Sequence, residues 1–237
     1  MGPHGTATDQ GAALRPVRTL LVDDQVPLRR ALGTVLSADP GIEVVGDVGD
    51  GRAAIEAVRS RGIDVVLMDI RMPGLDGVGA TREVTRLSPS TRVLILTTFD
   101  ADELVAAAVR AGASGYLTKD TRPSALRQAV RDVAAGTSAL APGVAATVID
   151  LLREAPAPAP EREATADPLH GLTPREVDVF TLIAAGRSNA EICAELFLSE
   201  NTVKTHVRAV LMKLGLRDRV HVVIHAYEHG LIRRPPT

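Results

Sequence analysis

Five positions at the ends of short apolar runs carry side chains that together could hold a phosphoryl group. Asp23 and Asp24 follow one run and Asp69 follows another, so three carboxylates are candidates for a single acidic site. Carboxylates that converge without a cation repel one another, and Mg²⁺ relieves that repulsion while it keeps ligand positions for water and a phosphate oxygen. Thr97 and Lys119 follow two further runs, and a hydroxyl and an ammonium group suit charged phosphate oxygens. These residue types predict a phosphoryl group held on one carboxylate.

Alternating patterns before residue 140 predict the fold that brings these side chains together. Five strand-like runs alternate with five amphipathic segments, which is typical of an α/β doubly wound, five-stranded parallel sheet. Such sheets have their sites where the loops at the carboxyl ends of the strands converge. A lone aspartate there is often only a turn or cap residue, so the prediction depends on the whole set. We expect strands at Thr19–Val22, Val44–Val45, Val65–Met68, Val93–Leu96 and Gly115–Leu117, and helices near 26–38, 51–61, 76–87, 102–111 and 121–135.

A proline-rich segment indicates that the chain has two domains. Residues 155–160 alternate Ala and Pro, and the charged stretch that follows cannot form a core, so we expect a semi-rigid, solvated linker. The expected organisation is a flexible N-terminal tail over 1–16, an α/β domain over 17–138, a linker with a helical start over 139–170, an all-α domain over 171–232 and a C-terminal tail over 233–237.

Four segments of the first domain resemble the flavodoxin-like receiver domain of response regulators, over about residues 17 to 136. The resemblance implies that Asp69 is the phosphoacceptor. One departure from the usual helix pattern is Gly79, which would cost about 1 kcal/mol in a helix interior relative to Ala. The resembling segments are Leu21–Asp24, Val66–Gly77, Leu96–Thr98 and Ala111–Lys119.

The same resemblance implies which residues surround the phosphoryl group. Lys119 would pair with the phosphate, the hydroxyl of Thr97 would move to it, and the ring of Tyr116 would turn inward as the second member of a switch pair. The implied Mg²⁺ ligands are Asp24, Asp69, the carbonyl of Arg71 and, through water, Asp23.

Two other functions fit the same sheet. A flavodoxin-like cofactor protein would have a Ser/Thr/Gly-rich phosphate loop after the first strand, whereas residues 23–25 are Asp-Asp-Gln and would repel a phosphate without a metal. The alternative that we keep is a receiver that controls transcription without phosphorylation and is gated by protein contacts. The complete acidic set argues against it.

The pattern after the linker is that of a four-helix, helix-turn-helix domain. Thr173 is expected as the N-cap of the first helix, with Pro174 at its first position and Glu176 completing a capping box. A short helix that ends at Leu196, a tight connection and a basic helix then follow in the order of a helix-turn-helix. The remaining helices are expected at Asn189–Leu196, from the cap Ser199 to Leu214, and from Asp218 to Tyr227.

The helix after Ser199 has one apolar and one polar face. The apolar stripe suits a core, and the polar face suits base contacts in a DNA major groove. A polar face is also what any solvated surface helix has, so a protein-binding module is a second interpretation. The stripe is Val203, Val207, Val210, Leu211 and Leu214, and the opposite face carries Asn201, Lys204, Thr205 and Arg208.

Three segments of this domain resemble the LuxR/GerE-type DNA-binding domain, over about residues 168 to 232: Leu172–Val177, Gly186–Cys193 and Thr202–Gly215. With the receiver, the whole chain resembles the NarL/FixJ subfamily of two-component response regulators. The resemblance implies that Lys204, Thr205 and Arg208 read bases and that the last helix pairs with a second copy. The complete set of expected DNA contacts is Asn201, Thr202, Lys204, Thr205, His206, Arg208 and Lys213, with His206 and Lys213 on phosphates.

Composition fits a regulator rather than a secreted or membrane protein. The single cysteine excludes an internal disulfide, and no apolar stretch approaches the ~18 residues needed to span a bilayer. Residues 172–237 hold nine Lys/Arg against seven Asp/Glu, so the second domain is mildly basic. We expect a cytoplasmic, non-enzymatic transcriptional regulator. Its expected partners are a sensor histidine kinase, double-stranded operator DNA, a second copy recruited on phosphorylation and, as a further candidate, RNA polymerase.

Overall fold

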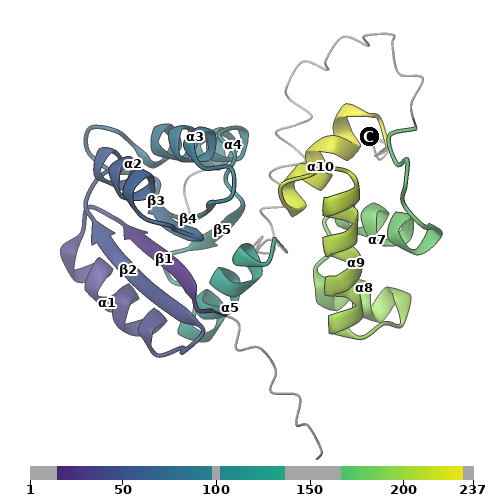
Figure 1. Cartoon of the computed structure of the whole chain (residues 1–237), viewed down its shortest axis with the longest axis horizontal. Coiled ribbons are helices and arrows are strands. Elements are labelled where there is room, and N and C mark those ends of the chain that lie inside the picture. The colour runs from purple at the N-terminus through teal and green to yellow at the C-terminus, as the bar shows by residue number, and fades with distance from the viewer. Residues whose placement is uncertain (1–14, 98–101, 137–166, 232–237) are drawn as a thin grey trace, which may run out of the picture.

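The computed structural model describes residues 15–97, 102–136 and 167–231, and the expected Ala-Pro linker lies outside them (Figure 1). Five parallel strands form one sheet in the order β2-β1-β3-β4-β5. The doubly wound α/β prediction is confirmed. The strands are β1 (Val17–Val22), β2 (Ile42–Val48), β3 (Val65–Asp69), β4 (Arg92–Thr97) and β5 (Gly115–Thr118), and the helices are α1 (Val26–Ser37), α2 (Gly51–Ser60), α3 (Gly77–Leu87), α4 (Asp102–Arg110) and α5 (Pro123–Ala134).

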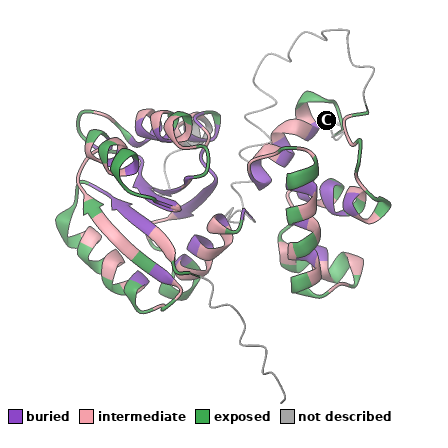
Figure 2. Ribbon diagram, in the orientation of Figure 1, coloured by how far each residue is buried: buried purple, intermediate pink, exposed green. Residues whose placement is uncertain are grey.

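Two apolar layers sandwich the sheet because strand side chains alternate between its faces. Leu20 and Val22 belong to the layer that α2, α3 and α4 cover, whereas Leu21 belongs to the layer under α1 and α5. All of β3 is buried, as expected for a central parallel strand. Figure 2 shows this burial as purple strands beneath helices whose outer sides are green.

The second strand is longer than the apolar pattern predicts. β2 runs through Gly46 and Asp47, beyond the expected Val44–Val45, because it pairs with β1 along its whole length. A register shift between Thr19 and Leu20 accommodates the pairing. As the edge strand, β2 is only partly buried, so its sequence does not need to be continuously apolar.

Four helices form the second domain around an apolar cluster that includes Phe180, Ile192 and Val207. The predicted capping box is present, since Thr173 accepts from the backbone of Glu176 while the Glu176 carboxylate accepts from the backbone of Thr173. None of the described helices has both the length and the hydropathy needed to cross a membrane. The helices are α7 (Pro174–Ala184), α8 (Asn189–Leu196), α9 (Glu200–Lys213) and α10 (Arg219–Glu228).

Candidate functional site

Three carboxylates converge at the carboxyl edge of the sheet. Asp23 and Asp24 directly follow β1, and Asp69 is the last residue of β3. One oxygen from each lies within 4.8 Å of the others, so the group could hold a metal ion. Asp23 and Asp69 are almost fully buried, whereas Asp24 is exposed. The site is therefore open to solvent on one side.

Lys119 joins two of these carboxylates. Its Nζ lies 2.8 Å from Oδ2 of Asp23 and 2.9 Å from Oδ2 of Asp69. The lysine is held in place at the end of β5, where its backbone N–H donates to the carbonyl of Thr97 at 2.8 Å. Burial raises the pKa of Asp69, and the Lys119 ammonium opposes that shift. An ammonium between two carboxylates can transfer to a phosphoryl oxygen without losing its ionic environment.

The loop after β3 approaches Asp69 so closely that only glycine fits. The N–H of Gly77 donates to the carbonyl of Ile70 at 3.0 Å, which sets the start of α3 directly against the end of β3. A Cβ at Gly77 would lie 2.1 Å from the carbonyl oxygen of Asp69. The backbone N–H of Arg71 lies 3.4 Å from Oδ1 of Asp69. Gly77 thus positions the aspartate although it carries no functional group.

Gly79 lies in the first turn of α3 and not in the helix interior that the sequence suggested. Its N–H donates to the carboxylate of the N-cap Asp76 at 2.7 Å. A Cβ at Gly79 would lie 2.8 Å from the Cδ1 atom of Leu75, which is the end of a flexible side chain. The glycine therefore leaves room for Leu75 beneath the cap.

The expected switch residues lie on neighbouring strands. Thr97 ends β4 and is buried, while Thr98 lies outside the described residues. Tyr116 on β5 is 2% exposed, and its ring packs in the apolar layer that includes Ala108 and Ile95. Burial raises the pKa of the Tyr116 hydroxyl. The tyrosine is therefore already in the inward position.

The apolar stripe predicted for α9 faces the core. Val203, Val207 and Val210 are fully buried, and the expected DNA-reading residues Asn201, Thr205 and Arg208 are exposed on the other side. Three further residues expected to contact DNA, Thr202, Lys204 and His206, are partly exposed.

Two of the expected DNA contacts already have acidic partners. Nζ of Lys213 lies 2.6 Å from Oε2 of Glu176, and this hydrogen bond, with the backbone N–H of Thr173, lowers the pKa of Glu176 to about 2. Nζ of Lys204 lies 2.8 Å from Glu200 on the same helix. Lys213 thus holds the end of α9 against the capping box of α7, so a DNA phosphate would have to share it.

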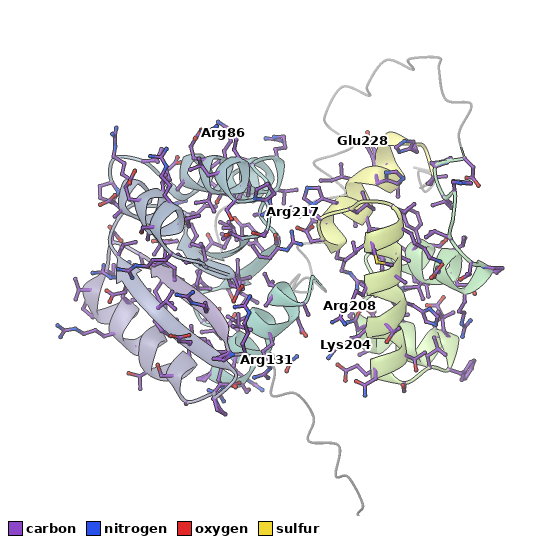
Figure 3. The ribbon with its side chains drawn as sticks, viewed as in Figure 1. Arg86, Arg131, Lys204, Arg208, Arg217 and Glu228 are labelled. Carbon is purple, nitrogen blue, oxygen red and sulfur yellow. The ribbon has the colours of Figure 1, made fainter. Side chains whose placement is uncertain are left out.

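The loop between α9 and α10 contacts the first domain at the amino ends of β4 and β5. Arg217 donates a hydrogen bond to the carbonyl of Thr91, directly before β4, and Figure 3 shows Arg217 between the two domains. Asp218 is fully buried. Burial opposes its ionisation, but His221 and the hydroxyl of Ser114, directly before β5, hold its pKa below the usual range. Nothing in the sequence pattern predicted this interface.

The face of α9 that the sequence predicts to contact DNA is turned toward α5 of the first domain. Lys204 and Arg208 lie on the side of α9 that faces α5 in Figure 3. Nζ of Lys204 is 4.0 Å from Oδ1 of Asp132 on α5. A DNA duplex could not reach Lys204 without displacing α5.

The chain is similar to known regulators over nearly its whole length. The family described as "Response regulator receiver domain" matches residues 19–131, and "Bacterial regulatory proteins, luxR family" matches residues 170–226. The DNA-binding transcriptional activator DevR/DosR of Mycobacterium tuberculosis is 38% identical, over 92% of this chain and 98% of that protein. The nitrate/nitrite response regulator protein NarP of Escherichia coli is 39% identical, over 88% of this chain and 94% of that protein.

A solved structure shows the same two-domain likeness. The response regulator ChrA of a heme-sensing two-component system is 37% identical and has a TM-score of 0.50, over 92% of this chain and all of that chain. The chain therefore belongs to the two-component response regulators of the NarL/FixJ subfamily, and it is a phosphorylation-dependent, DNA-binding transcriptional regulator.

Proposed function

We propose that Asp69 accepts a phosphoryl group from a sensor histidine kinase and that this event allows α9 to bind operator DNA. The observation that carries the proposal is the convergence of Asp23, Asp24 and Asp69 at one edge of the sheet, where Lys119 pairs with Asp23 and Asp69. We also propose the domain limits expected above, 17–138 for the receiver and 171–232 for the DNA-binding domain. A DNA-binding regulator acts where the chromosome is, which supports a cytoplasmic location.

The geometry suits an in-line transfer to a carboxylate. An oxygen of Asp69 attacks phosphorus as the bond to the kinase histidine breaks, and the product is an aspartyl phosphate. Lys119 then exchanges its contact with Asp69 for a phosphoryl oxygen and keeps its contact with Asp23. Thr97 and Tyr116 are proposed to register the new charge, with the Thr97 hydroxyl turning to the phosphate.

The oxygen donors at this edge fit Mg²⁺, which prefers a few carboxylates together with water and phosphate oxygens. Asp24, Asp69 and the carbonyl of Arg71 would hold the ion, with Asp23 acting through water. When bound, Mg²⁺ neutralises charge on the phosphoryl oxygens.

On the DNA side, base contacts are proposed for Lys204, Thr205 and Arg208, which reach solvent from one face of α9. Asn201 and Thr202 would lie beside them at the start of the helix. His206 and Lys213 are proposed as phosphate contacts, Lys213 by sharing its ammonium with Glu176.

Dimerisation through α10 is proposed to follow from release of the receiver. Val220 and Val223 are buried although neither belongs to the apolar cluster of the helical domain. The part of α10 that carries these two valines is therefore covered in this conformation. A second copy could pair there only if these two valines become exposed. RNA polymerase is a further proposed partner of the DNA-bound dimer.

The interface gives a test of this coupling. We expect Ser114→Ala to raise the operator affinity of the unphosphorylated protein about 5-fold, because the docked state loses the polar contact of the Ser114 hydroxyl with buried Asp218, worth about 1 kcal/mol. Ser114 belongs to the receiver and cannot itself contact DNA. Fluorescence anisotropy measures the affinity, and Ser90→Ala, an exposed serine nearby, is the matched control. Unchanged affinity for Ser114→Ala would exclude this interface as the restraint.

DNA recognition is tested with an operator selected from a random duplex pool by the phosphorylated protein. We expect Arg208→Ala to lower affinity for this selected operator about 10-fold or more and to reduce the salt dependence of binding, because one positive charge is removed from the interface. Binding by wild type and Arg208→Ala with equal affinity would instead favour a protein-binding role for α9.

A further inference from the structure

Phe197, in the turn between α8 and α9, is exposed in a way that the fold does not explain. It is 94% exposed, more than any other large apolar side chain that the structure describes. It is also the one non-glycine residue in the described ranges with a positive φ, at 55°. Exposure of a phenyl ring and a left-handed backbone are both unfavourable for such a residue.

The turn needs this backbone conformation but not this side chain. The N–H groups of Phe197 and Leu198 both donate to the carbonyl of Cys193, and these two hydrogen bonds close the end of α8. The guanidinium of Arg175 donates to the carbonyl of Leu196 at 2.6 Å. Leu198 then packs against the core. Glycine or asparagine adopts the left-handed conformation at lower cost. The ring must therefore contribute something other than stability.

Its position indicates what it meets. Phe197 lies two residues before Ser199, the N-cap of α9, so it belongs to the turn that leads into the helix whose exposed face carries Asn201 and Thr205. The receiver does not cover it. Figure 1 shows α8 and α10 at opposite ends of the domain, so a second copy paired through α10 would not cover it either. The surface that remains continuous with it is the one proposed for DNA.

We propose that Phe197 is a DNA-contacting residue, whose ring packs on a deoxyribose of the strand that borders the major groove where α9 enters. A recognition helix in the groove brings the preceding turn against the sugar-phosphate backbone. The sugar is the apolar part of that backbone, and Glu195 and Glu200 on either side disfavour a direct phosphate contact. This inference rests on the proposed DNA-binding function.

The test uses the full chain and the selected operator. Phe197→Asn keeps a residue suited to the left-handed turn, so we expect an unchanged or higher thermal unfolding midpoint. We expect its operator affinity to fall about 10-fold, from the lost burial of the ring. The salt dependence should stay at the wild-type value, unlike that of Arg208→Ala, because no charge is removed. Phe197→Tyr keeps the ring and should bind like wild type.

The outcomes separate this inference from the function on which it rests. If Phe197→Asn binds the operator like wild type while Arg208→Ala does not, the sugar contact is wrong and DNA binding stands. If Phe197→Asn binds the operator normally but supports little transcription by purified RNA polymerase, the ring contacts the polymerase and the proposal is overturned. A lower unfolding midpoint would assign the ring a structural role. Failure of wild type to bind any duplex would overturn both.

Discussion

Asp69→Asn is expected to take up no phosphoryl group under conditions in which the wild-type chain takes up one. An amide oxygen does not displace a leaving group at phosphorus. Among the described carboxylates, only Asp23 is similarly buried and in contact with Lys119. Both oxygens of Asp23 are already held, one by the backbone N–H of Gln25 and one by Lys119, so Asp23 cannot replace Asp69 as the acceptor. Intact mass after incubation with Mg²⁺ and a small phosphodonor measures the uptake.

Two controls make the Asp69 result specific. Asp47→Asn alters an exposed carboxylate of β2 that pairs with Arg29, so it should take up phosphate like wild type. Removal of Mg²⁺ with a chelator should prevent uptake by wild type. A phosphoryl group on Asp69→Asn would show that another residue is the acceptor.

Gly77→Ala is expected to destabilise the receiver by about 2–4 kcal/mol, because overpacking of backbone against backbone cannot be relieved by a side-chain rotation. The added Cβ would lie 2.1 Å from the carbonyl oxygen of Asp69 and 2.8 Å from Cα of Ile70. Either α3 or the end of β3 must move. Phosphoryl uptake should slow about 100-fold, as expected when a reacting group shifts by about 1 Å.

The matched control for Gly77→Ala is Gly79→Ala. At position 79 the new methyl meets a flexible leucine end rather than backbone, so we expect a stability change within about 1 kcal/mol and near-normal uptake. Urea unfolding followed by circular dichroism measures stability, and the time course of intact mass measures uptake. Wild-type stability and uptake in Gly77→Ala would contradict the positioning role of this glycine.

Local signals predicted most of the elements. The Thr173 and Glu176 pair identified the start of α7 because a capping box is satisfied within four residues. The strand β3 was predicted from the apolar run Val65–Met68, because a central parallel strand is buried on both faces. The length of the edge strand β2 was underestimated, because pairing with β1 extends the strand through Gly46 and Asp47, where the sequence has no apolar run.

Contacts between distant residues could not be predicted. Lys213 pairs with Glu176 across two helices, and Ser114 meets Asp218 across two domains, so neither pair has a spacing that a sequence pattern reveals. The left-handed backbone at Phe197 could not be predicted either. A glycine would have indicated it, whereas a phenylalanine next to Leu198 suggests two buried core residues. Gly77 was visible as part of a motif, but its close approach to Asp69 depends on how α3 packs against the end of β3, which no sequence pattern reveals.

The central claim is that phosphorylation of Asp69 controls DNA binding, and the most direct test is operator affinity before and after phosphorylation at one salt concentration. For wild type we predict that phosphorylation raises the operator affinity about 10-fold or more, within the usual range of allosteric coupling. Asp69→Asn should bind with the lower affinity whether or not the phosphodonor is present. Equal affinities of phosphorylated and unphosphorylated wild type would contradict the account and would favour a receiver gated by protein contacts alone.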